Sequence, residues 1–199
     1  MKHLCSLVIT AFLVGCVVET SGPEPALVDP VQALEQRVSL ARQYIGAGDL
    51  ENAKRKLELA ATIDANNADV LEAFALVYQN IGEFELAESN FKEALDAVAG
   101  SRARNNYAAF LYAQGRYLEA AAGFREVTTD RLYSGRPRAF VDLGLTLLQT
   151  RETPEAKSAF SRALLMEPRN NTALLELNQI ELTEGDVAAA SGYYERYRA

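Results

Sequence analysis

An alanine recurs at nearly constant intervals along this chain, each time inside an amphipathic segment with the period of an α-helix. The intervals between successive alanines are 34, 33, 36 and 34 residues, for Ala53, Ala87, Ala120, Ala156 and Ala190. A spacing that returns to 34 after two small changes is typical of a tandem repeat, and it argues against a helical bundle with chance periodicity. The chain is therefore expected to stack repeated units, because one such unit cannot bury its apolar face alone.

The clearest unit runs from Pro137 to Asn170 and reads as two amphipathic helices joined by a short turn. Its pattern of small and large residues resembles the tetratricopeptide repeat, in which small residues let two helices approach closely. The template divides the chain into five repeats, at about 34–67, 68–100, 101–134, 137–170 and 171–199. We therefore predict an all-α domain over residues 31–199, folded as a right-handed superhelix of helix-turn-helix repeats.

The first fifteen residues have the proportions of a bacterial secretory signal, with Lys2 ahead of a short apolar core. That core is too short to span a bilayer, which needs about 20 apolar residues. It ends in Leu13-Val14-Gly15-Cys16, which resembles a lipobox. We therefore expect a signal peptide over 1–15 and lipidation of Cys16 by acyl chains such as palmitate. An ordinary signal peptide and a short anchor helix are the alternatives.

Residues 16–30 are expected to tether the lipid to the folded domain, since they contain Gly22, Pro23 and Pro25 and show no helical period. Pro30 is predicted to open the first helix, with Asp29 as its N-cap. Val17 follows the lipidated cysteine, where an Asp would retain a lipoprotein in the inner membrane in enterobacterial-type sorting. We therefore expect an outer-membrane, lipid-anchored protein that faces the periplasm.

Composition argues against several classes of function. The 199-residue chain has a net charge of −7, which disfavours nucleic acid as a partner, because phosphate binding needs clustered Lys and Arg. Without the signal peptide the chain would keep no histidine, and its one remaining cysteine would be acylated. Cys–His catalysis, Ser–His–Asp catalysis and His- or Cys-rich zinc sites are thereby excluded. We expect no enzyme, cofactor or metal site, with a carboxylate-based glycosidase as the enzymatic alternative.

The first helix of each tetratricopeptide repeat lines the concave side of the superhelix, so the template predicts a binding groove. By position the groove comprises Arg42, Glu72, Leu76, Gln79, Asn105, Ala109, Tyr112, Val141, Leu145 and Leu148. Its middle part is apolar, which favours an extended peptide or a helix with apolar anchors. Leu145 and Leu148 are equally compatible with core packing, since groove and core positions lie close together on a helix.

The longest interval between alanines arises from a connection inserted before the fourth repeat, Thr128 to Arg138. Pro137 disfavours helix at the preceding residue, so we predict a loop over this segment with Tyr133 exposed. Loops inserted into a regular solenoid often carry function. A solvated surface loop is the alternative interpretation.

Two stretches resemble the PilF or PilW family of type IV pilus biogenesis proteins. The first is NNYAAFLY at 105–112 with RYLEA at 116–120, and the second is DRLY at 130–133 with RAFVDLGL at 138–145. The resemblance implies a pilotin, an outer-membrane lipoprotein that binds the secretin subunit and promotes its multimerisation. An envelope adaptor for peptidoglycan or outer-membrane assembly complexes is the alternative function. The family's sixth repeat has no counterpart before Ala199, so a missing repeat and a natural end both stay open.

Overall fold

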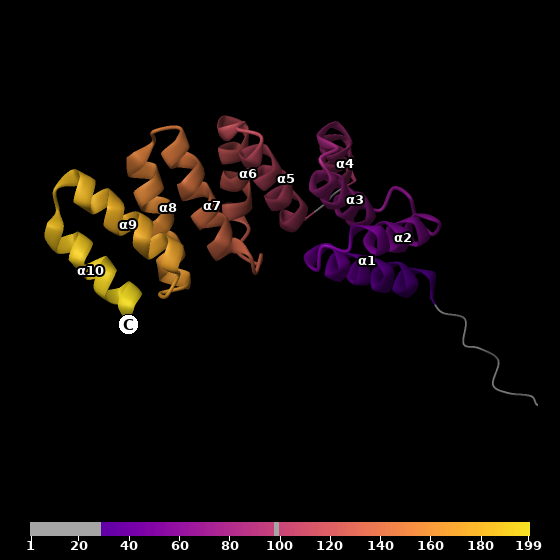
Figure 1. Ribbon diagram of the computed structural model, residues 1–199, viewed down its shortest axis with the longest axis horizontal. Coiled ribbons are helices and arrows are strands. Elements are labelled where there is room, and N and C mark those ends of the chain that lie inside the picture. The colour runs from indigo at the N-terminus through magenta and orange to yellow at the C-terminus, as the bar shows by residue number, and fades with distance from the viewer. Residues whose placement is uncertain (1–28, 98–99) are drawn as a thin grey trace, which may run out of the picture.

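The computed structural model describes residues 29–97 and 100–199, which form α-helices and no strand (Figure 1). The all-α class predicted from the repeat is confirmed. The predicted signal peptide, Cys16 and nearly all of the tether lie outside the described residues. None of the described helices is long and apolar enough to cross a membrane. In chain order the helices are α1 (Pro30–Gly46), α2 (Leu50–Ala61), α3 (Ala68–Ile81), α4 (Phe84–Asp96), α5 (Ser101–Ala113), α6 (Tyr117–Thr129), α7 (Arg136–Gln149), α8 (Thr153–Met166), α9 (Asn171–Glu184) and α10 (Val187–Arg198).

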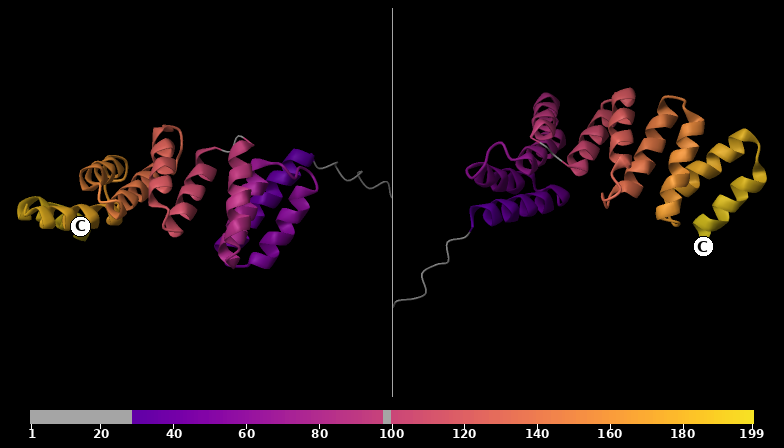
Figure 2. Two further views of the ribbon diagram at one scale, coloured as in Figure 1. Left: turned by 90° about the horizontal axis from the view of Figure 1, so that it is seen from above. Right: turned by 180° about the vertical axis from the view of Figure 1, so that it is seen from behind.

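The helices pair in chain order and the pairs follow one another in a row, seen from three directions in Figures 1 and 2. Each first helix packs on the second helix of its own repeat, and each second helix packs on the first helix of the next repeat. The first helices α1, α3, α5 and α7 also contact one another in succession, whereas the described second helices show no comparable contact. The first helices therefore form the inner side of the array, and the second helices form the outer side.

The recurring alanines lie where helices pack most tightly. Four of them are 0% exposed and the fifth, Ala190, is 1% exposed. In the fourth repeat Gly144 approaches even more closely, because a Cβ at this position would lie 2.6 Å from Cε1 of Phe160 on α8. Small residues therefore recur at these positions because the paired helices lie too close together for a larger side chain.

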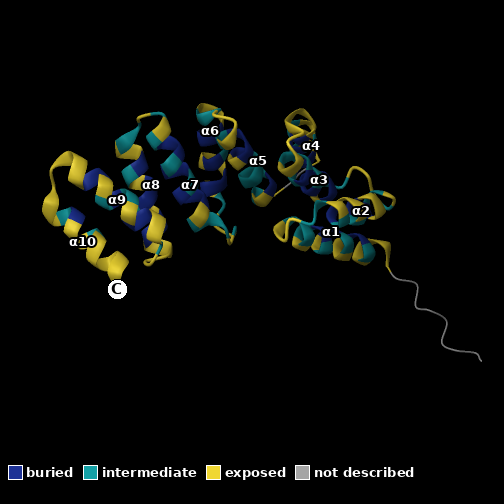
Figure 3. Ribbon diagram, in the orientation of Figure 1, coloured by how far each residue is buried: buried dark blue, intermediate teal, exposed yellow. Residues whose placement is uncertain are grey.

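Two apolar clusters form the core, and α3 contributes to both. One joins the first three helices around Leu57 and Val77, and the other extends from α3 to α9 around Phe91 and Phe160. Buried residues accordingly follow the length of the helix row in Figure 3. Because neighbouring repeats share buried contacts along the whole row, their first helices present one continuous inner face.

Side chains cap the helices, as the sequence predicts for Asp29 at the start of α1. The carboxylate of Asp29 accepts a hydrogen bond from the N–H of Val31, and Pro30 opens α1. Asp49 caps α2 in the same way, through the N–H of Asn52. In the fourth repeat Arg151 has a φ of 64°, in the turn where the other repeats have a glycine of positive φ.

The inserted connection is shorter than predicted. The loop covers residues 130–135, because α6 extends to Thr129 and α7 begins at Arg136. The prediction of a loop from 128 to 138 was wrong in its bounds. Pro137 lies in the first turn of α7, where a proline is tolerated because the N–H that it lacks would have no partner inside the helix. Tyr133 is half-buried, and its ring occupies the space where a Cβ on Gly135 would stand, while Leu132 is 96% exposed.

Candidate functional site: the inner groove

A fully buried carboxylate connects the first three repeats on the inner side. Glu72 on α3 is 0% exposed and accepts hydrogen bonds from residues of α1 and α5. The guanidinium of Arg42 donates at 2.9 Å, the Arg102 guanidinium at 2.7 Å, and the Asn106 amide at 2.6 Å. Two cations and an amide compensate the desolvation of one carboxylate, so this network fixes three consecutive inner helices. Its role is structural, since the carboxylate has no exposed surface.

Further along the groove, a cavity of about 210 Å³ opens between α5 and α7; we call it the Tyr112 cavity. Its lining residues are Ala109, Tyr112, Phe124, Arg138, Asp142 and Leu145. The buried Phe124 belongs to α6, while the other five belong to the two inner helices. The cavity is therefore mostly apolar with one ion pair, a suitable size and lining for an apolar side chain of a partner.

The ion pair of the Tyr112 cavity is partly desolvated. Arg138 donates from Nε to both carboxylate oxygens of Asp142, at 2.9 and 3.0 Å. Burial raises the pKa of Asp142, and the guanidinium opposes that rise. Burial also raises the pKa of Tyr112, with further contributions from Tyr117 and the carboxylates of Asp142 and Glu176. Glu176, on α9, therefore lies within electrostatic range of the Tyr112 hydroxyl.

A second cavity of about 210 Å³ opens between α7 and α9, and we call it the Leu148 cavity. Leu148 and Ile180 supply its apolar lining, and Glu176 and Glu184 supply carboxylates. Glu176 stands 34 residues after Asp142, one repeat further along the chain. The two cavities are thus equivalent places in successive repeats, and together they form what we call the inner groove.

The structure separates the predicted groove residues into core and surface. Val141 is 3% exposed and Glu72 is 0% exposed, so the prediction that they line the groove was wrong. Successive residues on a helix point about 100° apart. Val141 therefore packs into the core, while its neighbour Asp142 faces the cavity. Ala109, Tyr112, Leu145 and Leu148 do line cavities. The remaining predicted positions are half-buried on inner helices: Arg42, Leu76, Gln79 and Asn105.

Two inner-face amides have unused acceptors. Gln79 Oε1 and Asn105 Oδ1 are buried and accept no hydrogen bond from the part of the chain that the structure describes. Leaving a buried acceptor unpaired costs about 1–3 kcal/mol. Because both oxygen atoms are buried, they are not accessible to a partner in this arrangement of the helices.

The inserted loop reaches the same face. Burial raises the pKa of Tyr133, Arg102 lowers it, and the carboxylates of Glu72 and Asp142 raise it further. The Tyr133 hydroxyl therefore lies within electrostatic range of both the buried network and the Tyr112 cavity. The loop is held there by Asp130, which accepts hydrogen bonds from the Ser101 hydroxyl at 2.5 Å and from the N–H of Leu132 at 2.9 Å.

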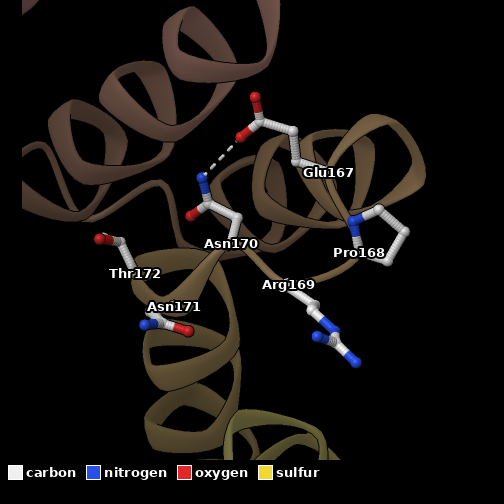
Figure 4. A pocket seen from close by; sticks show the side chains of 6 residues that line it. All are labelled: Glu167, Pro168, Arg169, Asn170, Asn171 and Thr172. Atoms are coloured by element: carbon white, nitrogen blue, oxygen red, sulfur yellow. Dashed lines mark hydrogen bonds between the residues drawn. The ribbon is translucent and has the colours of Figure 1, made fainter.

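Another cavity, of about 680 Å³, has a different character. It is lined by one continuous segment, residues 167–172, which connects α8 to α9 (Figure 4). Glu167 and Asn170 point toward each other in Figure 4 and form a hydrogen bond of 3.1 Å, and Asn170 also caps α9. The polar groups at this turn thus serve the helix end. In the described ranges no cluster of three or more His, Cys, Asp or Glu side chains could hold a metal ion.

Sequence reasoning missed Arg138, Asp142 and Glu176. The repeat itself contained a signal for two of them, since Asp142 and Glu176 occupy equivalent positions 34 residues apart. A carboxylate that recurs at the repeat period beside apolar groove positions could have been identified from the sequence.

Comparisons with known proteins agree with this architecture. The family model described as tetratricopeptide repeat matches residues 72–137 and 141–199. The chain is 34% identical over 189 residues to the type IV pilus assembly protein PilF of Pseudomonas aeruginosa. This alignment covers 93% of this chain and 74% of the relative.

Solved structures give the same picture. A structure from the functional characterisation of Pseudomonas aeruginosa PilF superimposes with a TM-score of 0.81 at 33% identity, covering 85% of this chain and 77% of that chain. A crystal structure of PilW, a widely conserved type IV pilus biogenesis factor, gives a TM-score of 0.74 at 24% identity, covering 84% and 77%. A crystal structure of MamA shares the fold at 18% identity, with a TM-score of 0.67 and coverage of 79% and 91%.

Proposed function

Because the chain belongs to the family of tetratricopeptide repeat proteins that includes the type IV pilus assembly protein PilF, we propose that it acts as a pilotin. In this role it binds the secretin subunit of the pilus through the inner groove. Binding promotes the localisation of the secretin to the outer membrane and its assembly into multimers. The protein contributes a preformed surface and no chemical step.

The observation that carries this proposal is the pair of equivalent cavities along the inner face. Each has a volume of about 210 Å³ and places apolar side chains next to at least one carboxylate, and the Leu148 cavity also has Thr153, Gln179 and Thr183 in its lining. A partner that inserts one side chain into each cavity buries its anchors in sites that already exist, which lowers the entropic cost of binding. The buried Glu72 network supports the same function, since it holds the inner helices in one arrangement.

Lipidation of Cys16 is the second part of the proposal. Acyl chains contribute about 0.8 kcal/mol for each buried CH₂ group, so several chains hold a protein stably on a membrane. The residues between Cys16 and α1 then place the repeats on the periplasmic side of the outer membrane. Replacing Cys16 with Ser is expected to release the protein into the soluble fraction. Retention in salt-washed membranes would show that another segment anchors it.

A deletion strain tests the function directly. We expect loss of surface pili and loss of secretin multimers from the outer membrane, with recovery of both on complementation. Normal multimers in the correct membrane would rule out a pilotin. A defect in cell-wall or outer-membrane assembly instead would indicate an envelope adaptor.

A further inference from the structure

The unpaired charge of the inner groove indicates the chemistry of its partner. At the Tyr112 cavity, Arg138 neutralises Asp142. Near the Leu148 cavity, Lys157 lies 2.8 Å from Glu184 and 2.9 Å from Glu181, so one cation faces two carboxylates. Glu176 forms no ion pair with any residue that the structure describes. These groups together carry an excess of two negative charges beside two apolar cavities.

Glu176 stands at the Leu148 cavity. It lines this cavity from α9, and its charge also contributes to the raised pKa of Tyr112 in the other cavity. A half-buried carboxylate beside an apolar site attracts a cation more strongly than an exposed one, because the local dielectric constant is lower. The position of this residue therefore favours a Lys or Arg close to the apolar side chain that enters the Leu148 cavity.

The spacing of the cavities limits the partner's conformation. The helix α7 separates them, and a helix with its side chains is about 10–12 Å wide. An extended chain advances about 3.3 Å per residue and its side chains alternate between two faces, so two anchors four residues apart face the groove together and reach both cavities.

We propose that the inner groove of repeats three to five recognises an extended segment with two apolar side chains four residues apart and a Lys or Arg two residues from the one that enters the Leu148 cavity. The apolar side chains enter the Tyr112 and Leu148 cavities, and the cation pairs with Glu176. This inference rests on the proposed function, because it describes the segment by which the partner is bound.

A charge swap in a peptide selection tests the proposal. The full-length protein, purified in detergent, is exposed to a random library of displayed peptides. The wild-type protein is expected to enrich sequences with two apolar residues four apart and a Lys or Arg two residues from one of them. The Glu176→Lys variant is expected to enrich Asp or Glu at the same place, and Glu176→Gln to lose the charge preference while keeping the apolar one.

Two controls separate the groove from other surfaces. Glu155→Lys, a swap at an exposed carboxylate on the outer helix α8, is expected to leave the wild-type preference unchanged. Ala109→Arg, which fills the Tyr112 cavity, is expected to abolish enrichment. The proposal is overturned if nothing is enriched, if wild type and Glu176→Lys enrich the same sequences, or if Ala109→Arg still selects them. A basic preference without any secretin defect in the deletion strain would contradict the pilotin role alone.

Discussion

Arg102 Nη2 lies 2.7 Å from Oε2 of Glu72, across the boundary between the second and third repeats. The arginine is 46% exposed, whereas the carboxylate that it contacts has no exposed surface. Arg42 approaches the same carboxylate from the first repeat, so one side chain is shared by three successive inner helices. The packing of these repeats thus depends on a single buried charge as well as on apolar contacts.

We predict that Glu72→Ala destabilises the fold by about 1–3 kcal/mol, because Arg42 and Arg102 lose their buried partner and keep only the exposed carboxylate of Asp69. Equilibrium denaturation in urea measures the loss. Glu155→Ala, at an exposed carboxylate, is the matched control and should stay within about 0.5 kcal/mol of wild type. Equal stabilities for the two variants would mean that the network contributes nothing.

The close packing of the helices makes a second prediction. Ala87 is 0% exposed, and Ala87→Leu should cost about 1–3 kcal/mol by forcing tightly packed helices apart. Thermal unfolding followed by circular dichroism provides the measurement. Ala122→Leu makes the same substitution at an exposed position of α6 and should melt like wild type. An unchanged melting temperature for Ala87→Leu would contradict the packing.

The loop makes a third prediction, because Gly135 leaves room for the ring of Tyr133. A Cβ on Gly135 would lie 2.5 Å from Cζ of that ring, so Gly135→Ala should displace the tyrosine from the inner face. The ring signal of Tyr133 in the NMR spectrum can be assigned by its loss in Tyr133→Phe. In Gly135→Ala its chemical shift should move toward the value of a solvent-exposed tyrosine. Gly192→Ala, where a Cβ meets nothing within 4 Å, should leave that resonance in place. A Tyr133 signal unchanged in Gly135→Ala would show that the ring does not depend on the glycine.

Stability should also depend on pH through Glu88. Lys92 and then Arg116 hold the pKa of this carboxyl at about 2, below its ordinary value of 4.5, with a smaller contribution from Tyr107. A lowered folded-state pKa contributes stability that is present above pH 4.5 and is lost as the pH falls toward 2. The difference in unfolding free energy between wild type and Glu88→Gln should therefore shrink across that range. A difference that stays constant from pH 7 to pH 2 would contradict this assignment.

The repeat spacing predicted the fold because close contact between paired helices allows only a small residue at one position of each repeat, as at Ala87. The groove was harder to predict because neighbouring residues on one helix face different environments. Val141 lies in the core while Asp142 lines a cavity, and no periodicity argument assigns a helix rotation to within one residue. Glu72 was misassigned for a related reason, since its partners Arg42 and Arg102 are 30 residues away in either direction.

Capture of the secretin subunit by groove variants tests the central claim most directly. Ala109→Arg introduces a long cation into the Tyr112 cavity, whereas Ala122→Arg places the same side chain at an exposed position of α6 that does not line this cavity. With purified full-length proteins, we predict that Ala109→Arg weakens secretin binding at least about tenfold, equivalent to about 1.4 kcal/mol, while Ala122→Arg binds like wild type. Equal binding by the two variants would contradict a role for the inner groove in recognising the secretin.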